Sequence, residues 1–174
     1  MKKFNFYFFL VLSIVVAMSS CKKEEDDDDN NNNNNEPTYE FKDQVLQGEI
    51  SGVAWEFKAG KYELDYWDST EYSVDLYDTT GAENFTTVCD VWTGDFDYNI
   101  MFSCPQDTGL YELGWGSQSI TLVDWTADPV LNIVLTEGAL HIISKTDSTL
   151  TGEIDAASDN ESYINGYFTI SLCQ

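Results

Sequence analysis

The sequence Tyr72-Ser73-Val74-Asp75-Leu76-Tyr77 decides the fold class. Tyr72, Val74 and Leu76 alternate in it with residues that are mostly polar. Successive side chains of a β-strand point to opposite faces of the sheet, so this period of two predicts a half-buried strand.

Segments of the same kind lie on both sides of this stretch, separated by turn residues and spaced about 8 to 14 residues apart. No window shows a sustained helical period of 3.6. We therefore expect an all-β domain, an antiparallel β-sandwich or barrel with little or no helix. Gly152 and Gly166 interrupt predicted strands, where glycine marks a bulge or close packing against an aromatic ring. The predicted strands are residues 45–51, 53–57, 62–66, 72–77, 87–92, 99–104, 110–113, 120–124, 130–136, 139–145, 150–156 and 164–172.

The first twenty residues have the pattern of a secretory signal peptide. Lys2 and Lys3 precede an apolar run at residues 6–17, and small residues follow it. The run is shorter than the roughly 20 residues that span a bilayer. We expect residues 1–20 to be removed, residues 21–37 to form a tether and residues 38–174 to form one domain.

Met18-Ser19-Ser20-Cys21 resembles a bacterial lipobox, with Met18 in the position where leucine is usual. The resemblance implies that Cys21 receives a diacylglyceryl thioether, and acyl chains such as palmitate, and becomes the first residue of the mature protein. Two or three acyl chains hold a protein durably on a membrane, because each buried CH₂ adds about 0.8 kcal/mol.

The residues after Cys21 are strongly polar. Lys23-Glu24-Glu25 and the aspartates behind them resemble the export signal of Bacteroidota surface lipoproteins, which implies the outer face of the outer membrane. The alternative is an acidic spacer that carries no export signal, and the alternative location is then the periplasmic face of the membrane. Acids and asparagines cannot build a core, so residues 22–37 are predicted to be a disordered tether with a reach of up to about 50 Å.

The charge of the chain is very unbalanced: 31 Asp and Glu against 8 Lys and Arg give a formal net charge of −23. Residues 38–174 keep 24 of these acids beside four lysines, a net charge of −20. Such a surface repels phosphate backbones and anionic lipid. Nucleic acid is excluded as a partner, and cations and cationic proteins become more plausible ones.

Short phrases across residues 45–173 resemble small β-domains of Bacteroidota lipoproteins of unknown function. They are residues 109–113, 138–142, 150–154 and 164–168. The resemblance implies a secreted β-sandwich or a calycin-like barrel, and it carries over no catalytic residue.

With Cys21 acylated, three cysteines remain, so at most one internal disulfide can form. A hairpin between residues 87–92 and 99–104 would place Cys89 opposite Cys104, which makes this pair the first candidate. Cys104 with Cys173 is the second, and buried free thiols are the alternative to both.

The sequence shows no catalytic motif and no set of metal ligands. His141 is the only histidine and is expected to point away from the face of its strand neighbours, Leu140 and Ile142. Asp95 with Asp97, or the acids at 155, 159 and 161, could offer oxygen ligands to calcium, but neither set has EF-hand spacing. We expect no cofactor and no resident metal.

Aromatic side chains are the best candidates for ligand contact, because sugar faces stack on aromatic rings. Tyr66 and Trp67 end a predicted strand at a polar loop, and Trp115 stands between two glycines. The leading hypothesis is a non-catalytic surface module that binds a glycan or a partner protein. The alternatives are a calycin-like carrier of a small apolar ligand and, less favoured, a glycoside hydrolase with two carboxylates.

The anchor can be tested directly. The substitution Cys21→Ala removes the lipid attachment atom and should move the protein from the membrane fraction to the soluble fraction. Fractionation and immunoblotting measure the shift. Continued membrane association of the variant would contradict lipidation at Cys21.

Overall fold

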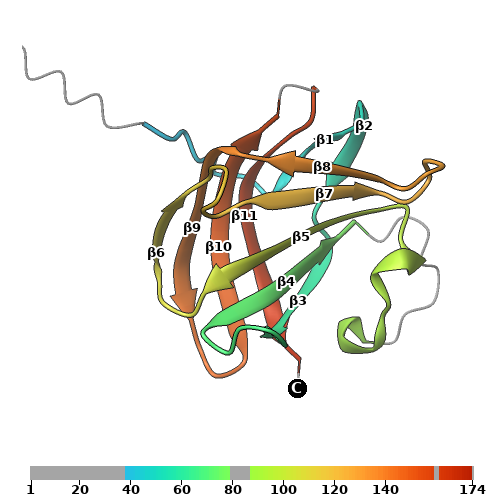
Figure 1. Cartoon of the computed structure of the whole chain (residues 1–174). Coiled ribbons are helices and arrows are strands. Elements are labelled where there is room, and N and C mark those ends of the chain that lie inside the picture. Colours follow the sequence, from blue (N-terminus) through green and yellow to red (C-terminus); the bar gives the residue numbers. More distant parts are fainter. Residues whose placement is uncertain (1–37, 79–86, 159–160, 174) are drawn as a thin grey trace, which may run out of the picture. The chain divides into compact units, whose positions relative to one another are not determined.

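The computed structural model describes residues 38–78, 87–158 and 161–173, which belong to one compact unit. These residues form eleven strands and two short 3-10 turns, so the all-β prediction is confirmed (Figure 1). In the described ranges, no helix has the length and hydrophobicity needed to cross a membrane. The strands are β1 (Gln47–Ile50), β2 (Val53–Glu56), β3 (Ala59–Leu64), β4 (Glu71–Tyr77), β5 (Tyr98–Pro105), β6 (Gly109–Glu112), β7 (Ile120–Asp124), β8 (Leu131–Leu135), β9 (Glu137–Lys145), β10 (Thr149–Ala157) and β11 (Tyr163–Leu172), and the 3-10 turns are η2 (Val88–Asp90) and η3 (Thr93–Asp95).

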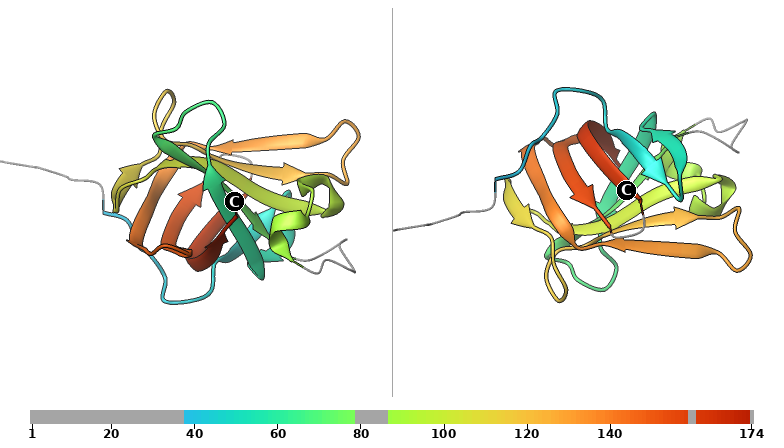
Figure 2. Two further views of the ribbon diagram at one scale, coloured as in Figure 1. Left: turned by 90° about the horizontal axis from the view of Figure 1, so that it is seen from below. Right: turned by 90° about the horizontal axis from the view of Figure 1, so that it is seen from above.

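The strands form a single curled sheet rather than two separate layers. Its order is β6-β9-β10-β11-β3-β4-β5-β7-β8, and β1 and β2 attach as a hairpin beside β11. The orange and red strands β9 to β11 lie across a shared interior from the green and yellow strands β4, β5 and β7 (Figure 2). β6 and β8 end the path without pairing with each other, so the sheet is an open half-barrel.

β11 joins the parts of the sheet. It pairs with β10 along almost its whole length. Its first residues pair with β1, and its last residues, Ser171 and Leu172, pair in parallel with Lys61 and Tyr62 of β3. Ile164, Phe168 and Ile170 of β11 are buried, as the period of two predicts.

The interior of the curl is filled with side chains. Buried residues from the strands on both sides form one contiguous cluster, in which the rings of Phe102 and Phe168 meet edge to face at 6.1 Å. The clefts described below open at the surface. The core is therefore filled by side chains, and this packing does not support the hypothesis of a carrier with an internal ligand cavity.

Two glycines allow close contacts within this packing, as expected from the sequence. The β9–β10 register shifts between Thr151 and Gly152, and a Cβ on Gly152 would lie 2.8 Å from Cζ of Phe168. Gly166 has a φ of +129°, and a Cβ there would lie 2.5 Å from the carbonyl oxygen of Gln44.

Residues 38–44, called here the N-terminal strap, cross the outer face of the sheet. The Glu40 amide donates to Asp155 Oδ2 at 2.9 Å, and the Lys42 amide donates to Asn165 Oδ1 at 2.8 Å. Asn165 Nδ2 donates back to the Glu40 carbonyl at 3.0 Å. Side chains of β10 and β11 therefore hold the strap at Glu40 and Lys42, and its last residue, Gln44, accepts the Tyr167 amide through its carbonyl at 2.9 Å.

The predicted hairpin between residues 87–92 and 99–104 is wrong. β5 pairs with β4 on one edge and with β7 on the other, so it leaves no edge for residues 87–92. That segment instead forms η2 and, with η3, lies against the outer face of β4. There Phe96 stacks on Tyr77 with ring centroids 4.2 Å apart, and Val91 joins them in a second small core.

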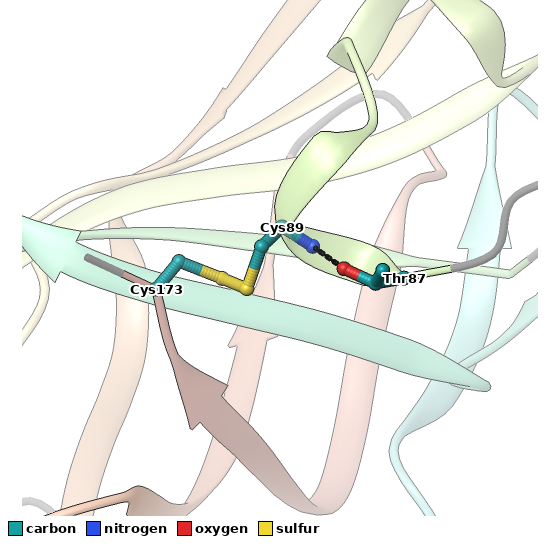
Figure 3. The surroundings of a disulfide bond; sticks show 3 residues. All are labelled: Thr87, Cys89 and Cys173. Carbon is teal, nitrogen blue, oxygen red and sulfur yellow. Dashed lines mark hydrogen bonds between the residues drawn. A yellow bond between two sulfur atoms is a disulfide. The ribbon is translucent and has the colours of Figure 1, made fainter.

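This hairpin does not form, and both disulfide pairs predicted from the sequence are also wrong. Cys89 is bonded to Cys173 across a sequence separation of 84 residues (Figure 3). Thr87 caps η2 by accepting the Cys89 amide at 3.1 Å, and the Cys173 amide donates to the Tyr62 carbonyl at 2.8 Å. Cys104 is a free thiol in the main core, and burial raises its pKa to about 12.

The pairing predicts a definite thiol count. Of Cys89, Cys104 and Cys173, unfolded protein should show one reactive thiol, Cys104, without reductant and all three with it; Cys21 adds none if it carries lipid as expected from the sequence. The double substitution of Cys89 and Cys173 by serine should lower the free energy of unfolding by about 2–4 kcal/mol, because the bond closes a long loop. Ellman titration and denaturant unfolding measure the two effects. Three thiols without reductant would contradict the bond.

Candidate functional site

A shallow cleft on the outer face of β4, β5 and β7, called here the polar groove, is the first candidate site. Val74, Phe102 and Leu122 point into the core, so their neighbours in each strand point outward. Ser73 lies opposite Ser103 in the β4–β5 register, and Met101 lies opposite Thr121 in the β5–β7 register. The cleft has a volume of about 380 Å³ and is lined by Asp65, Glu71, Ser73, Met101, Phe102, Ser103, Ser117, Gln118, Ser119 and Thr121.

The β3–β4 loop at one end of the groove presents two aromatic rings to solvent. Tyr66 is 87% exposed and Trp67 is 90% exposed. Their rings contact each other edge to face, with centroids 4.9 Å apart and an interplanar angle of 88°. The sequence-predicted pair is therefore brought together, on the surface and beside a cleft.

Asp65 fixes the shape of this loop. Its carboxylate accepts hydrogen bonds from the amides of Trp67 at 2.8 Å and Asp68 at 3.0 Å, and from Ser103 Oγ at 3.3 Å. These bonds, the two amides first, hold the pKa of Asp65 below its usual range. The ionised form is thus the one that holds the loop. Its contribution is present above the ordinary carboxyl pKa and is lost as the pH falls through the lowered one.

The β6–β7 loop stands at the other end of the groove and presents Trp115, which is 85% exposed. The turn is closed by the Gly114 amide, which donates to the Gln118 carbonyl at 2.9 Å, and Gly116 takes a φ of +80°. The Gln118 side chain donates to the carbonyl of Ser103. Ser103 therefore forms a hydrogen bond with each of the two aromatic loops: its hydroxyl bonds to the β3–β4 loop and its main-chain carbonyl bonds to the β6–β7 loop.

Sequence reasoning missed the groove floor. Ser73, Ser103 and Gln118 carry no motif, and only the outward positions of the period-two strands could have indicated them. It also missed the pair formed by Trp92 and Trp125, whose ring centroids lie 5.7 Å apart outside the groove. Trp55, by contrast, is buried in the core.

The other sequence candidates lie away from the groove. His141 Nδ1 lies 2.9 Å from Glu153 Oε1 on the outer face, as expected from its strand position. Among the described residues, no group of three or more His, Cys, Asp or Glu side chains is arranged to hold a metal ion. Asp155 binds the N-terminal strap, and residue 159 of the proposed calcium set lies outside the described residues.

The pKa of the Asp75 carboxyl is raised, chiefly because the group is partly buried, with Lys61 opposing the shift and Glu63 adding to it. Asp75 does not line the groove. A glycoside hydrolase needs a general acid with a raised pKa in the cleft itself. Asp65, which lines the groove together with Glu71, has a lowered pKa, which does not suit Asp65 to the role of a general acid.

The role of Asp65 can be tested by proteolysis. The substitution Asp65→Ala removes the acceptor of two loop amides and should speed chymotryptic cleavage after Tyr66 and Trp67 about tenfold, because the loop then opens more often. Mass spectrometry of the fragments measures the rate. The control is Asp107→Ala, at an exposed acid whose main-chain carbonyl accepts the Tyr111 hydroxyl. Equal cleavage of both variants would contradict the role.

No protein-family model, no curated protein and no solved structure matches this chain. The groove is lined by small hydroxyls, an amide and an ionised carboxylate, and the loops that border it carry the exposed rings of Tyr66, Trp67 and Trp115.

Proposed function

We propose that the protein is a lipid-anchored module of the bacterial cell surface that binds a glycan in the polar groove and does not transform it. The leader and Cys21 support the anchor. The observation that carries the binding function is the placement of Tyr66, Trp67 and Trp115, nearly fully exposed, in the two loops that border the groove.

Exposed tryptophans have a large apolar area to bury on a ligand. Covering about 100 Å² of a ring removes a free-energy cost of about 2.5 kcal/mol. A sugar ring has apolar C–H faces and a rim of hydroxyls, so it can stack on Trp67 while its hydroxyls bond to groups of the groove. Ser73, Ser103 and Asp65 offer such donors and acceptors.

The loops are also held in place before a ligand arrives. In the β3–β4 loop, Asp65 accepts the Trp67 amide and the Ser103 hydroxyl. In the β6–β7 loop, the Gln118 side chain donates to the Ser103 carbonyl. A preformed site binds more tightly because less conformational entropy is lost on binding. This arrangement supports recognition by a fixed surface rather than by a loop that orders around its ligand.

The proposal predicts a specific loss of binding. The full-length protein in detergent micelles should bind a subset of a glycan array, and Trp67→Ala should weaken that binding at least about tenfold, because stacking area is lost. The unfolding midpoint should not change, because the side chain is almost fully exposed.

The matched control is Trp92→Ala, which removes another exposed tryptophan that lies outside the groove. It should leave glycan binding unchanged. Absence of binding to every glycan, or equal losses in the two variants, would contradict the proposal.

A further inference from the structure

β8 is an edge strand without the usual protection of an edge. It ends the sheet path and pairs only with β7, from Ile120↔Leu135 to Asp124↔Leu131, and no other strand of the described residues pairs with it. Sheet edges exposed to solvent are normally blunted by charged residues, proline or a bulge. The sequence Leu131-Asn132-Ile133-Val134-Leu135 contains neither a charge nor a proline.

A cleft of about 720 Å³, called here the β8 cleft, lies along this strand. Four consecutive residues of β8, Leu131 to Val134, form one wall. The β1–β2 turn contributes Ser51 and Gly52, and the lining is completed by Trp115, Thr136, Glu137, Ser158 and Glu161.

We infer that this edge receives an extended, basic segment of a partner protein, which adds to the sheet as a further strand. The main chain of β8 supplies hydrogen-bonding groups that β7 does not use, and strand addition draws its affinity from such groups. Exposed Leu131 and Val134 point to opposite faces of the sheet, and each offers an apolar contact to the added strand on its own face.

Charge identifies the occupant. Glu137 and Glu161 line the cleft, and no lysine does. A second copy of the domain would bring its own net charge of −20 to the interface, and the chain's own residues 22–36 carry seven acids beside two lysines. Like charges brought together repel, whereas a basic segment is attracted. The linings of the two clefts have no residue in common, although Trp115 of the β8 cleft stands in the loop that borders the polar groove, and the inference does not rest on glycan binding.

The test uses fluorescein-labelled peptides of alternating valine and lysine with the full-length protein in detergent micelles, read by fluorescence anisotropy. The valine–lysine peptide should bind. A valine–glutamate peptide, and a valine–lysine peptide N-methylated at alternate residues, should bind at least about tenfold more weakly, because one lacks the charge and the other lacks main-chain donors.

A charge placed on the edge should block the added strand. Val134→Lys should weaken binding of the valine–lysine peptide about tenfold. Ile143→Lys is the matched control, because Ile143 is 46% exposed against 38% for Val134 and lies at the register shift of β9, outside the β8 cleft.

Three results would overturn the inference. The first is equal binding of the N-methylated peptide, which would leave only charge attraction. The second is equal behaviour of the two lysine variants. The third is a dimer of the free protein in sedimentation velocity that Val134→Lys abolishes, which would make a second copy the occupant.

Discussion

The main-chain hydrogen bonds of β11 connect the parts of this domain. One edge of the strand holds β10, and its other edge is divided between β1 near the start and β3 at the end. Without the short parallel pairing of Ser171 and Leu172 with β3, the group β6-β9-β10-β11 and the group β3-β4-β5-β7-β8 would be two separate sheets. The Cys89–Cys173 bond follows directly after this pairing and closes the same joint covalently. The curl that places outward side chains of β4, β5 and β7 on one surface therefore depends on a few residues near the end of the chain.

Local patterns in the sequence predicted what depends on local physics. The alternation in residues 72–77 predicted β4 and its inward face, and the glycines at 152 and 166 indicated close contacts that the structure contains. What failed depends on pairing between distant segments. Residues 87–92 look like a strand on their own, but both edges of β5 are taken by β4 and β7, so no edge remained for them. The error in the disulfide followed from this one, since Cys104 faces the core while Cys89 lies on the outer side.

The candidate site was predictable in its aromatic residues and not in its floor. Tyr66, Trp67 and Trp115 could be selected because each stands next to turn residues, where a large ring has little core to enter. The sequence could not tell that their loops meet at Ser103, because that requires the registers of β4, β5 and β7 together. Serines in outward strand positions are common, and only the curl and the two flanking loops turn this set into a cleft.

The N-terminal strap has a mechanical consequence. Tension applied to the chain at residue 38 reaches the bonds of Glu40 and Lys42 to Asp155 and Asn165 before it reaches the β1–β11 ladder. These bonds join main chain to side chains at separate points, so they can break one at a time and lengthen the chain without opening a strand pair. Such a segment extends under load before the domain itself begins to unfold. If the chain is anchored through Cys21 as proposed, tension would enter the domain at the strap, and the strap would yield before the core or the groove is disturbed.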